Sequence, residues 1–544
     1  MQQLRNMTAD TQATHAEAPQ LRFAPEKLVR LQQEYVNDAT ELWNQSLRAN
    51  PMLKDRRFSG AAWANNPLAS HAAAVYMLNA RALMNLAEAA EGDAKTKNRL
   101  RFAVEQWLAA SAPSNFLAFN ADAQQKAIDT QGQSLAQGVK NLLHDMRQGH
   151  VSMTDESVFE VGRNVATTEG AVVFENELFQ LIEYKPLTAK VRERPFLLVP
   201  PCINKYYILD LQPENSFIRY AVSQGFRTFV VSWRNPDQSL AHKSWDDYIE
   251  DAAIKSIYTV QDITGAKQIN ALGFCVGGTI LMAALAVLAA RGEKPVAAVT
   301  LLTALVDFTD TGVLDVFIDE NFVRFREMQM GQGGLMSGKD LAATFSFLRP
   351  NDLVWNYVVG NYLKGETPPP FDLLYWNSDS TNLPGPWYAW YLRNTYLENN
   401  LVKPGKAVVC GEKIDLRKLD DIPFYIYGSR EDHIVPIGGA YASTQVIAGK
   451  KRFVMGASGH IAGVINPPVA NKRSHWVRED GKFPKDVNQW IAGATEIPGS
   501  WWEDWTGWLK SHAGKLIAAP KGYGKRPKYP AIEPAPGRYV KAQA

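Results

Sequence analysis

Residues 269–278 read INALGFCVGG, and this stretch decides the fold. The apolar run 269–274 predicts a buried strand, and the Ala- and Leu-rich residues 279–290 predict a helix directly after it. Glycines stand on both sides of Cys275, where a sharp strand-to-helix turn leaves no room for a Cβ atom. The pattern is typical of a nucleophile elbow, with cysteine in place of the usual serine. Because a helix N-terminus favours a thiolate, Cys275 is the candidate nucleophile.

Short apolar runs on both sides of this turn predict a parallel sheet. They lie at 195–199, 228–232, 297–302, 423–427 and 452–455, and a hairpin is expected at 171–184. Helical segments at 217–224 and 245–264 separate the first of these strands. Alternation of buried strands and helices indicates an α/β architecture with helices on both faces of the sheet.

The remaining segments predict helices and an insertion. Apolar residues recur at helical spacing through much of the first 150 residues, after about 20 polar residues that we expect to be disordered. The aromatic, Pro-punctuated stretch 307–421 predicts an insertion over the sheet. The four tryptophans between 501 and 508 predict a packed amphipathic helix, and the basic, Pro-rich residues 523–544 a solvated tail.

A thiol nucleophile needs a base and an acid that orients the base, and in this topology they follow the nucleophile in the order acid, base. Asp432 comes directly after the strand 423–427, and His460 directly after the strand 452–455. Both lie where the carboxyl ends of strands present side chains, so they are the candidate acid and base.

Other residues compete for these roles. Glu431 or Asp307 could supply the acid, and His433 the base. Asp432 ranks above Asp307 because of its turn motif, YGSREDHIVP. His460 ranks above His433 because adjacent residues on a loop rarely orient one another, and His433 could instead contact substrate.

Two backbone donors are expected to stabilise an oxyanion. One is the N–H of Val276, the residue after the nucleophile. The other is expected from the loop 200–204, PPCIN, with Ile203 as the candidate, although the sequence leaves the choice of N–H within that loop open. Cys202 and Cys410 are expected to be buried and inert.

Composition excludes several classes of protein. Lys plus Arg is 58 against 56 for Asp plus Glu in 544 residues, which leaves no net field to attract nucleic acid or an anionic membrane. No apolar run approaches the roughly 20 residues of a membrane span, and no secretory signal is evident. Three widely spaced cysteines predict neither a disulfide framework nor a zinc site and favour a reducing cytoplasm.

With these motifs in view, the sequence resembles the class I polyhydroxyalkanoate synthases, which polymerise (R)-3-hydroxybutyryl-CoA into a storage polyester. The resemblance runs from about Phe58 to the C-terminus. It rests on the blocks PPCINKYYILDLQP (200–213), SWRNPD (232–237), GFCVGGT (273–279), FLRPNDLVWNY (347–357), NLPGPWY (382–388), YGSREDHIVP (427–436), GASGHIAGVINPP (456–468) and AIEPAPGRYVKA (531–542).

The resemblance implies an α/β-hydrolase catalytic domain over 156–544 with a cap insertion at about 300–400, preceded by a mostly helical domain over 1–155. It implies Cys275, Asp432 and His460 as the catalytic triad, (R)-3-hydroxyacyl-CoA as substrate, coenzyme A as leaving group, and no cofactor or metal. A cysteine hydrolase or thioesterase on the same scaffold is the alternative enzyme, and a non-catalytic granule-associated module the alternative outside enzymes.

The resemblance also implies partners and a location. It predicts a homodimer formed through the cap side near Trp387 and Trp390, and a cytoplasmic enzyme on polyester granules. The helical N-terminal domain is expected to contact the granule surface and granule-associated proteins. We place Arg349 near the CoA entrance, because a fixed cation suits phosphate.

Overall fold

The computed structural model describes residues 21–46 and 53–544, so the predicted disorder of the first 20 residues lies outside the described part of the chain. The chain divides into two compact units. One consists of Met1–Gln148 with Pro350–Glu366, and the other of Gly149–Arg349 with Thr367–Ala544. The first unit thus includes a segment that the sequence analysis had assigned to the insertion over the sheet.

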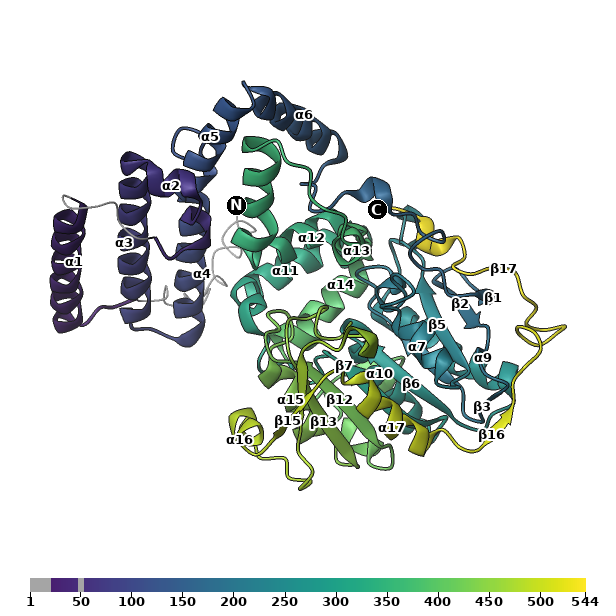
Figure 1. Cartoon of the computed structure of the whole chain (residues 1–544). Helices are drawn as coiled ribbons and strands as arrows, with labels where there is room; N and C mark the ends of the chain where they lie inside the picture. The colour runs from purple at the N-terminus through teal and green to yellow at the C-terminus, as the bar shows by residue number, and fades with distance from the viewer. Residues whose placement is uncertain (1–20, 47–52) are drawn as a thin grey trace, which may run out of the picture. The chain divides into compact units, whose positions relative to one another are not determined.

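The first unit is helical, as the apolar spacing predicts. Its helices are α1 (Pro25–Ser46), α2 (Ala61–Asn65), α3 (Pro67–Ala89), α4 (Ala94–Ser111), α5 (Ala121–Asp129) and α6 (Gln133–Gln148). Helix α3 packs between α1 and α4 (Figure 1). Asn66 caps α3 and Asp93 caps α4, each side chain accepting a backbone N–H. A turn at Gln131 and Gly132, which both have positive φ, separates α5 from α6.

The segment Pro350–Glu366 packs on α6 within this unit. It forms the short π-helical turns η8 (Asn351–Trp355) and η9 (Val358–Leu363). The hydroxyl of Tyr362 donates to Asp145 of α6 over 2.6 Å, and Asn141 donates to the carbonyl of Asn361 over 2.9 Å. A Cβ on Gly138 would lie 2.0 Å from the carbonyl oxygen of Tyr362, so glycine permits this close packing.

A twisted sheet forms the centre of the second unit (Figure 1). In the described residues it has eleven strands in the order β15-β14-β13-β12-β7-β6-β4-β5-β2-β1-β17. The six from β13 to β5 are parallel, and the outer strands pair antiparallel. Their bounds are β1 (Gly170–Glu175), β2 (Phe179–Tyr184), β4 (Phe196–Val199), β5 (Thr228–Trp233), β6 (Ile269–Phe274), β7 (Val296–Leu302), β12 (Phe424–Ser429), β13 (Lys451–Gly456), β14 (Ser474–Val477), β15 (Thr495–Pro498) and β17 (Glu533–Pro534).

Alternating side chains of the buried strands fill two apolar layers. In β4, Leu197 and Val199 join the core with the helices η6 (Tyr248–Ile254), α9 (Lys255–Thr264), α10 (Val276–Ala290) and α15 (Ile437–Val446). Phe196 and Leu198 join the opposite core, with α7 (Phe217–Ser223) and α17 (Trp502–His512). Side chains of a strand point alternately to its two faces, so a continuous apolar run is what a sheet covered on both sides requires.

Within the second unit, the insertion after β7 is helical. Its main elements are η7 (Gly312–Phe317), α11 (Glu320–Met330), α12 (Gly338–Phe347), α13 (Asp372–Ser378), α14 (Gly385–Tyr391) and η10 (Leu392–Leu397), with the short pair β8 (Leu335–Met336) and β9 (Leu383–Pro384). Trp387 of α14 is fully buried, and Trp390 stacks on Trp245 at 4.7 Å between ring centroids. Trp387 therefore packs inside the subunit and Trp390 is half-buried, and the predicted dimer contact beside them stays a prediction.

The C-terminal residues correct one expectation. Instead of a solvated tail, Glu533–Pro534 forms β17 on the edge of β1, and Val540 is buried. Arg538 forms ion pairs with Glu175 and Glu533, both at 2.7 Å. The basic, Pro-rich composition predicts a solvated tail. Pairing with the edge strand β1 and a few buried apolar side chains instead hold these residues on the sheet. The tryptophan cluster is core, as predicted, with Trp501, Trp502 and Trp505 buried.

Candidate active site

Cys275 occupies the turn between β6 and α10. Its backbone has φ 52° and ψ −129°, a conformation that residues with a side chain seldom adopt. Its N–H donates to the carbonyl of Leu302 over 3.0 Å, which fixes the turn to the end of β7. The thiol is half-buried and lines a cavity. The elbow thus presents the sulfur to a cavity at the N-terminus of a helix.

Two glycines allow this turn to form. A Cβ atom on Gly273 would lie 2.4 Å from the Cα of Gly278, and one on Gly277 would lie 2.2 Å from the carbonyl oxygen of Val199. Both distances are far below van der Waals contact, and the obstructing atoms are backbone that cannot rotate away. The close approach of strand, turn and helix predicted from the sequence is present at both positions.

His460 and Asp432 meet at the carboxyl ends of neighbouring strands. Nδ1 of His460 lies 2.6 Å from Oδ2 of Asp432, and both side chains are buried. Because an ionised carboxylate only accepts hydrogen bonds, Nδ1 carries the proton of this contact. Oδ1 of Asp432 accepts the N–H groups of Ile434 and Val435 over 2.8 and 2.9 Å. The carboxylate is therefore held on both oxygens and orients the imidazole.

The environment makes His460 a strong base. Burial on its own lowers the pKa of His460, but the charges of Asp432 and Cys275, together with hydrogen bonds to both side chains, raise it to about 10. The ring of His460 stacks on Phe274, the residue before Cys275, at 5.8 Å between ring centroids. The three candidate triad residues therefore lie close together, with a hydrogen bond between His460 and Asp432.

The buried tryptophans support the loop that carries His460. The indole N–H of Trp501 donates to the carbonyl of Gly463 over 3.1 Å, and that of Trp502 to the carbonyl of Val464 over 2.9 Å. The hydroxyl of Tyr427 also donates to Gly463. Since indoles are rigid donors, these bonds fix the backbone just after the imidazole.

The candidate oxyanion donors line the same cavity as the thiol. Val276 is the first residue of α10, so its N–H has no carbonyl partner within the helix. Ile203, in the loop after β4, lines the cavity together with Cys275 and Val276. A carbonyl oxygen that lies against Cys275 could therefore meet donors from both segments.

A segment of the insertion holds the loop of Ile203 in place. We call residues 376–381 the latch. The N–H of Thr381 donates to the carbonyl of Ile203 over 2.9 Å, and the indole of Trp376 donates to the carbonyl of Lys205 over 2.7 Å. Asn204 and Ser380 form an antiparallel bridge between these bonds. The latch thus fixes the backbone at the C-terminal end of the candidate oxyanion loop.

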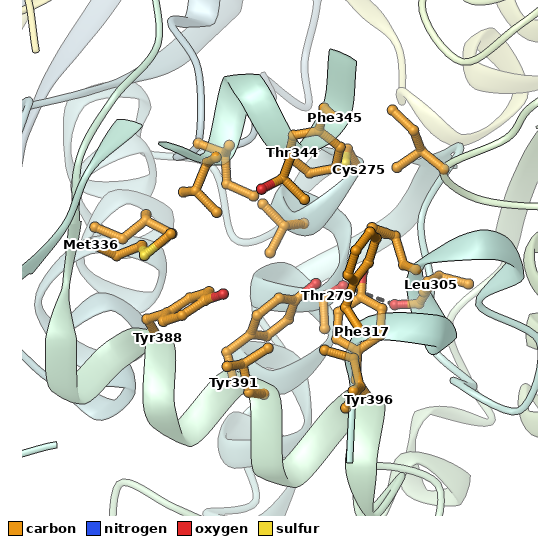
Figure 2. Close-up of a pocket in the computed structure, with 18 of the residues that line it drawn as sticks. Cys275, Thr279, Leu305, Phe317, Met336, Thr344, Phe345, Tyr388, Tyr391 and Tyr396 are labelled. Carbon is orange, nitrogen blue, oxygen red and sulfur yellow. Dashed lines mark hydrogen bonds between the residues drawn. The ribbon is translucent and has the colours of Figure 1, made fainter. Parts of the chain in front are cut away.

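The cavity beside Cys275 has a volume of about 190 Å³ and mostly apolar walls (Figure 2). Aromatic and aliphatic side chains of the insertion form most of its surface, among them Phe317, Phe322, Met336, Leu341 and Phe345. It is smaller than the roughly 300–1,000 Å³ pockets that enclose drug-sized ligands. The space has room for a small, mostly apolar group.

The competing acids are engaged elsewhere. Asp307 accepts hydrogen bonds from Thr309 in its own turn and from Asn399 at the far end of the insertion, and exposed Glu431 pairs with Arg430 at 3.3 Å. His433 is half-buried and Arg349 exposed, and neither is among the residues that line the cavity. Their contact with substrate or CoA stays a prediction.

The other two cysteines lie in environments that disfavour a thiolate. Burial raises the pKa of Cys202 far above its usual range. Burial, together with the charges of Asp246 and Glu250, raises the pKa of Cys410 to about 12.

Sequence reasoning missed the polar residues of the cavity wall. Arg326 of α11 and Tyr388 of α14 line it with Cys275, although they come from different parts of the insertion. Tyr388 stands in a recognised block, NLPGPWY, whereas nothing in the sequence around Arg326 distinguishes it from the neighbouring Arg324. Only the packing of the insertion brings them to the site.

Comparisons with known proteins agree with this geometry. Residues 54–221 match the family described as the poly-beta-hydroxybutyrate polymerase (PhaC) N-terminus, and residues 195–467 match the alpha/beta hydrolase fold. The chain is 61% identical over 533 residues to the poly(3-hydroxyalkanoate) polymerase subunit PhaC of Cupriavidus necator, covering 96% of this chain and 90% of that protein. The chain belongs to the class I polyhydroxyalkanoate synthases.

Other polyhydroxyalkanoate synthases extend this similarity. The subunit PhaC of Rhizobium meliloti is 38% identical over 96% of this chain and 86% of that protein. The polymerase of Methylorubrum extorquens is 39% identical over 96% of this chain and 88% of its own length. The predicted family and the predicted α/β-hydrolase fold are both confirmed, and the chain is an enzyme of polyhydroxyalkanoate polymerisation. Among the helices that the structure describes, none is long and apolar enough to cross a bilayer.

Proposed function

We propose that the chain polymerises (R)-3-hydroxyacyl-CoA, chiefly (R)-3-hydroxybutyryl-CoA, by covalent thioester catalysis at Cys275. The observation that carries this proposal is the 2.6 Å contact of His460 with Asp432, made by an imidazole that stacks on Phe274, the residue before Cys275. An apolar cavity of acyl size adjoins the thiol. Nucleophile, base and orienting acid are therefore in reach of one bound acyl group.

The loading step transfers an acyl group between two sulfurs. His460 takes the thiol proton, and the sulfur of Cys275 attacks the thioester carbonyl of the substrate. The N–H groups of Val276 and Ile203 stabilise the oxyanion. The bond between the carbonyl carbon and the CoA sulfur then breaks, and CoA leaves with the proton from His460. One thioester replaces another, so the acyl group stays activated, which a serine ester would not achieve.

The extension step forms the ester bond. His460 takes the proton of the 3-hydroxyl group of another hydroxyacyl unit, and the hydroxyl oxygen attacks the acyl group on Cys275. A new C–O bond forms, the bond to Cys275 breaks, and the thiol recovers the proton. Asp432 keeps the imidazole oriented in both steps. The apolar cavity excludes water, which would otherwise hydrolyse the acyl-enzyme and end the chain.

Coenzyme A is the leaving group in this scheme, and no cofactor or metal is expected to take part. We place His433 and exposed Arg349 near the CoA moiety, because the nucleotide part has to remain outside the acyl cavity. The phosphates of CoA suit a guanidinium, which can bind them in a bidentate manner.

The experiment that tests the function compares the wild type with Cys275→Ala and Cys410→Ala. Each protein is incubated with (R)-3-hydroxybutyryl-CoA while CoA release and chloroform-soluble polyester are measured together. We expect CoA and polymer from the wild type and from Cys410→Ala, and neither from Cys275→Ala. Free hydroxy acid without polymer would indicate a thioesterase, and polymer from Cys275→Ala would contradict thioester catalysis at this residue.

We also propose a homodimer at the surface of cytoplasmic polyester granules. The helical unit supports the granule contact because several large apolar side chains of its helices are exposed. They include Trp43, Trp107, Ile128, Val139 and Met146. Exposed apolar groups of this kind are typical of surfaces that bind apolar material or partner proteins. Binding of the isolated wild-type enzyme to washed granules, compared with Trp43→Ser and Trp107→Ser, tests this contact.

A further inference from the structure

Arg326 contributes a charged side chain to the mostly apolar cavity beside Cys275. Of the described residues that line the cavity, it is the only one with a cationic side chain. Its Nη1 donates to Gln329 over 2.8 Å, and its guanidinium lies over the ring of Phe322, 5.3 Å from the centroid. Its Nε is buried and has no hydrogen-bond partner among the described residues. A buried donor of a charged group without an acceptor is costly, so the site is built for an acceptor that a ligand brings.

Tyr388 provides a second donor beside this one. Figure 2 shows its hydroxyl pointing into the cavity from α14. Burial raises the pKa of Tyr388 and the charge of Arg326 opposes this effect, as expected for neighbouring groups. The threonine hydroxyls of the wall are already engaged, since Thr279 donates to the carbonyl of Leu305 over 2.8 Å and Thr344 to that of Asp340 over 2.9 Å.

The ligand that fits is rich in acceptors and poor in donors. A polyester of 3-hydroxyacyl units carries one ester carbonyl in each unit and a single hydroxyl at its free end. A guanidinium offers donors only, so it matches a group that accepts, such as an ester carbonyl. The apolar walls match the alkyl groups between the esters. The phosphates of CoA are a poorer match, because Arg326 lines a small, apolar cavity.

We propose that Arg326, assisted by Tyr388, holds an ester carbonyl of the chain attached to Cys275, so that the cavity binds the first units of the growing polyester. This inference rests on the proposed acylation of Cys275. Holding the chain at a carbonyl positions its thioester end against the nucleophile and keeps it there between additions. Arg326 is therefore a residue for processive extension and not for the first loading.

The test compares two dimeric acyl donors that differ by one carbonyl. One is the CoA thioester of 3-(3-hydroxybutyryloxy)butyrate, and the other is its ether analogue, 3-(3-hydroxybutoxy)butyryl-CoA. Acylation of Cys275 is followed by mass spectrometry. We expect the wild type to load the ester about tenfold faster, as kcat/KM, which is the effect of one hydrogen bond to a charged group. Arg326→Met should reduce this preference to about one, and it should make shorter polymer.

Arg324→Met is the matched control, because Arg324 lies on the same helix, is exposed and pairs with Glu320. It should keep the preference and the polymer length. If Arg326→Met does not fold, Tyr388→Phe provides the test instead. We expect it to reduce the preference for the ester over the ether dimer, by less than Arg326→Met would.

Three results would overturn the inference. They are a wild type that loads both dimers equally, an Arg326→Met enzyme that keeps the preference, and a variant that loses monomer and dimer loading alike. Absence of any acyl group on Cys275 in the wild type would instead contradict the proposed function, and the inference with it.

Discussion

Substitution of Asp432 tests whether its carboxylate orients the imidazole of His460. Asn in its place keeps an oxygen that can accept the N–H groups of Ile434 and Val435, which now bond Oδ1. The amide nitrogen would, however, meet Nδ1 of His460 as a donor and favour the wrong imidazole tautomer. We expect Asp432→Asn to fold and to lose roughly a thousandfold or more in kcat, as in other triads. CoA release at saturating substrate measures this loss, and a change below tenfold would contradict the orienting role.

The same substitution predicts a pH effect on stability. Burial lowers the pKa of His460, but Asp432 and Cys275 raise it to about 10, above the roughly 6.5 of an unfolded chain. The raised pKa stabilises the folded state fully below about pH 6.5, and this contribution declines as the pH rises towards 10. The difference in free energy of unfolding between wild type and Asp432→Asn should therefore shrink over this range. Urea unfolding at pH 6.5, 8 and 9.5 measures it, and a constant difference would be evidence against the coupling.

Sequence reasoning found the triad candidates because each follows a strand end, and backbone topology alone brings strand ends together. It did not find Arg326 and Tyr388, because their position depends on how α11 and α14 of the insertion pack. Local sequence carries little information on such long-range packing. Arg326 and Tyr388 come together only in the folded insertion, so their shared position could not be predicted from the sequence around either residue.

At the scale of elements, the close packing of the elbow predicts that one added methyl group will reduce stability and activity. In Gly277→Ala, the new Cβ would collide with the carbonyl oxygen of Val199, so strand β4 and helix α10 would have to separate. We expect a loss of stability above about 3 kcal/mol, together with loss of activity. Chemical denaturation measures the first, and CoA release the second.

Gly507→Ala is the matched control for this prediction. Gly507 lies inside α17, and nothing stands within 4 Å of the position of its Cβ. Since alanine favours a helix, the variant should be unchanged or more stable by up to about 1 kcal/mol. Equal destabilisation by both substitutions would contradict the steric account.

The central strands were predictable because their apolar runs are short, continuous and separated by helices. The antiparallel strands β14 and β15 were not, because β15 is exposed throughout and carries no apolar pattern. The division of α5 from α6 depends on two left-handed residues, Gln131 and Gly132, of which only the glycine hints at a turn.

At the scale of the whole molecule, the C-terminal residues cover one edge of the central sheet, where β17 pairs with β1. Deletion of residues 530–544 would remove β17 from β1, expose apolar surface that Val540 now covers, and free Glu175. We expect a lower midpoint of thermal unfolding and a tendency to aggregate, because an unpaired edge strand recruits other chains. Circular dichroism during a thermal ramp measures the midpoint, and light scattering during the same ramp measures aggregation. Arg538→Gln, which removes only exposed ion pairs, should change the midpoint little.

The hydrogen bond from Thr381 to Ile203 couples the position of the latch to the position of a candidate oxyanion donor. The latch holds the segment that carries one candidate oxyanion donor. A movement that lifted the latch to admit a long substrate would also weaken the electrophilic assistance that the substrate needs. An enzyme that moved in this way would alternate between an open state and a competent state. Such alternation would give a growing chain its protected intervals, because water that arrives while the gate is lifted meets an idle catalyst.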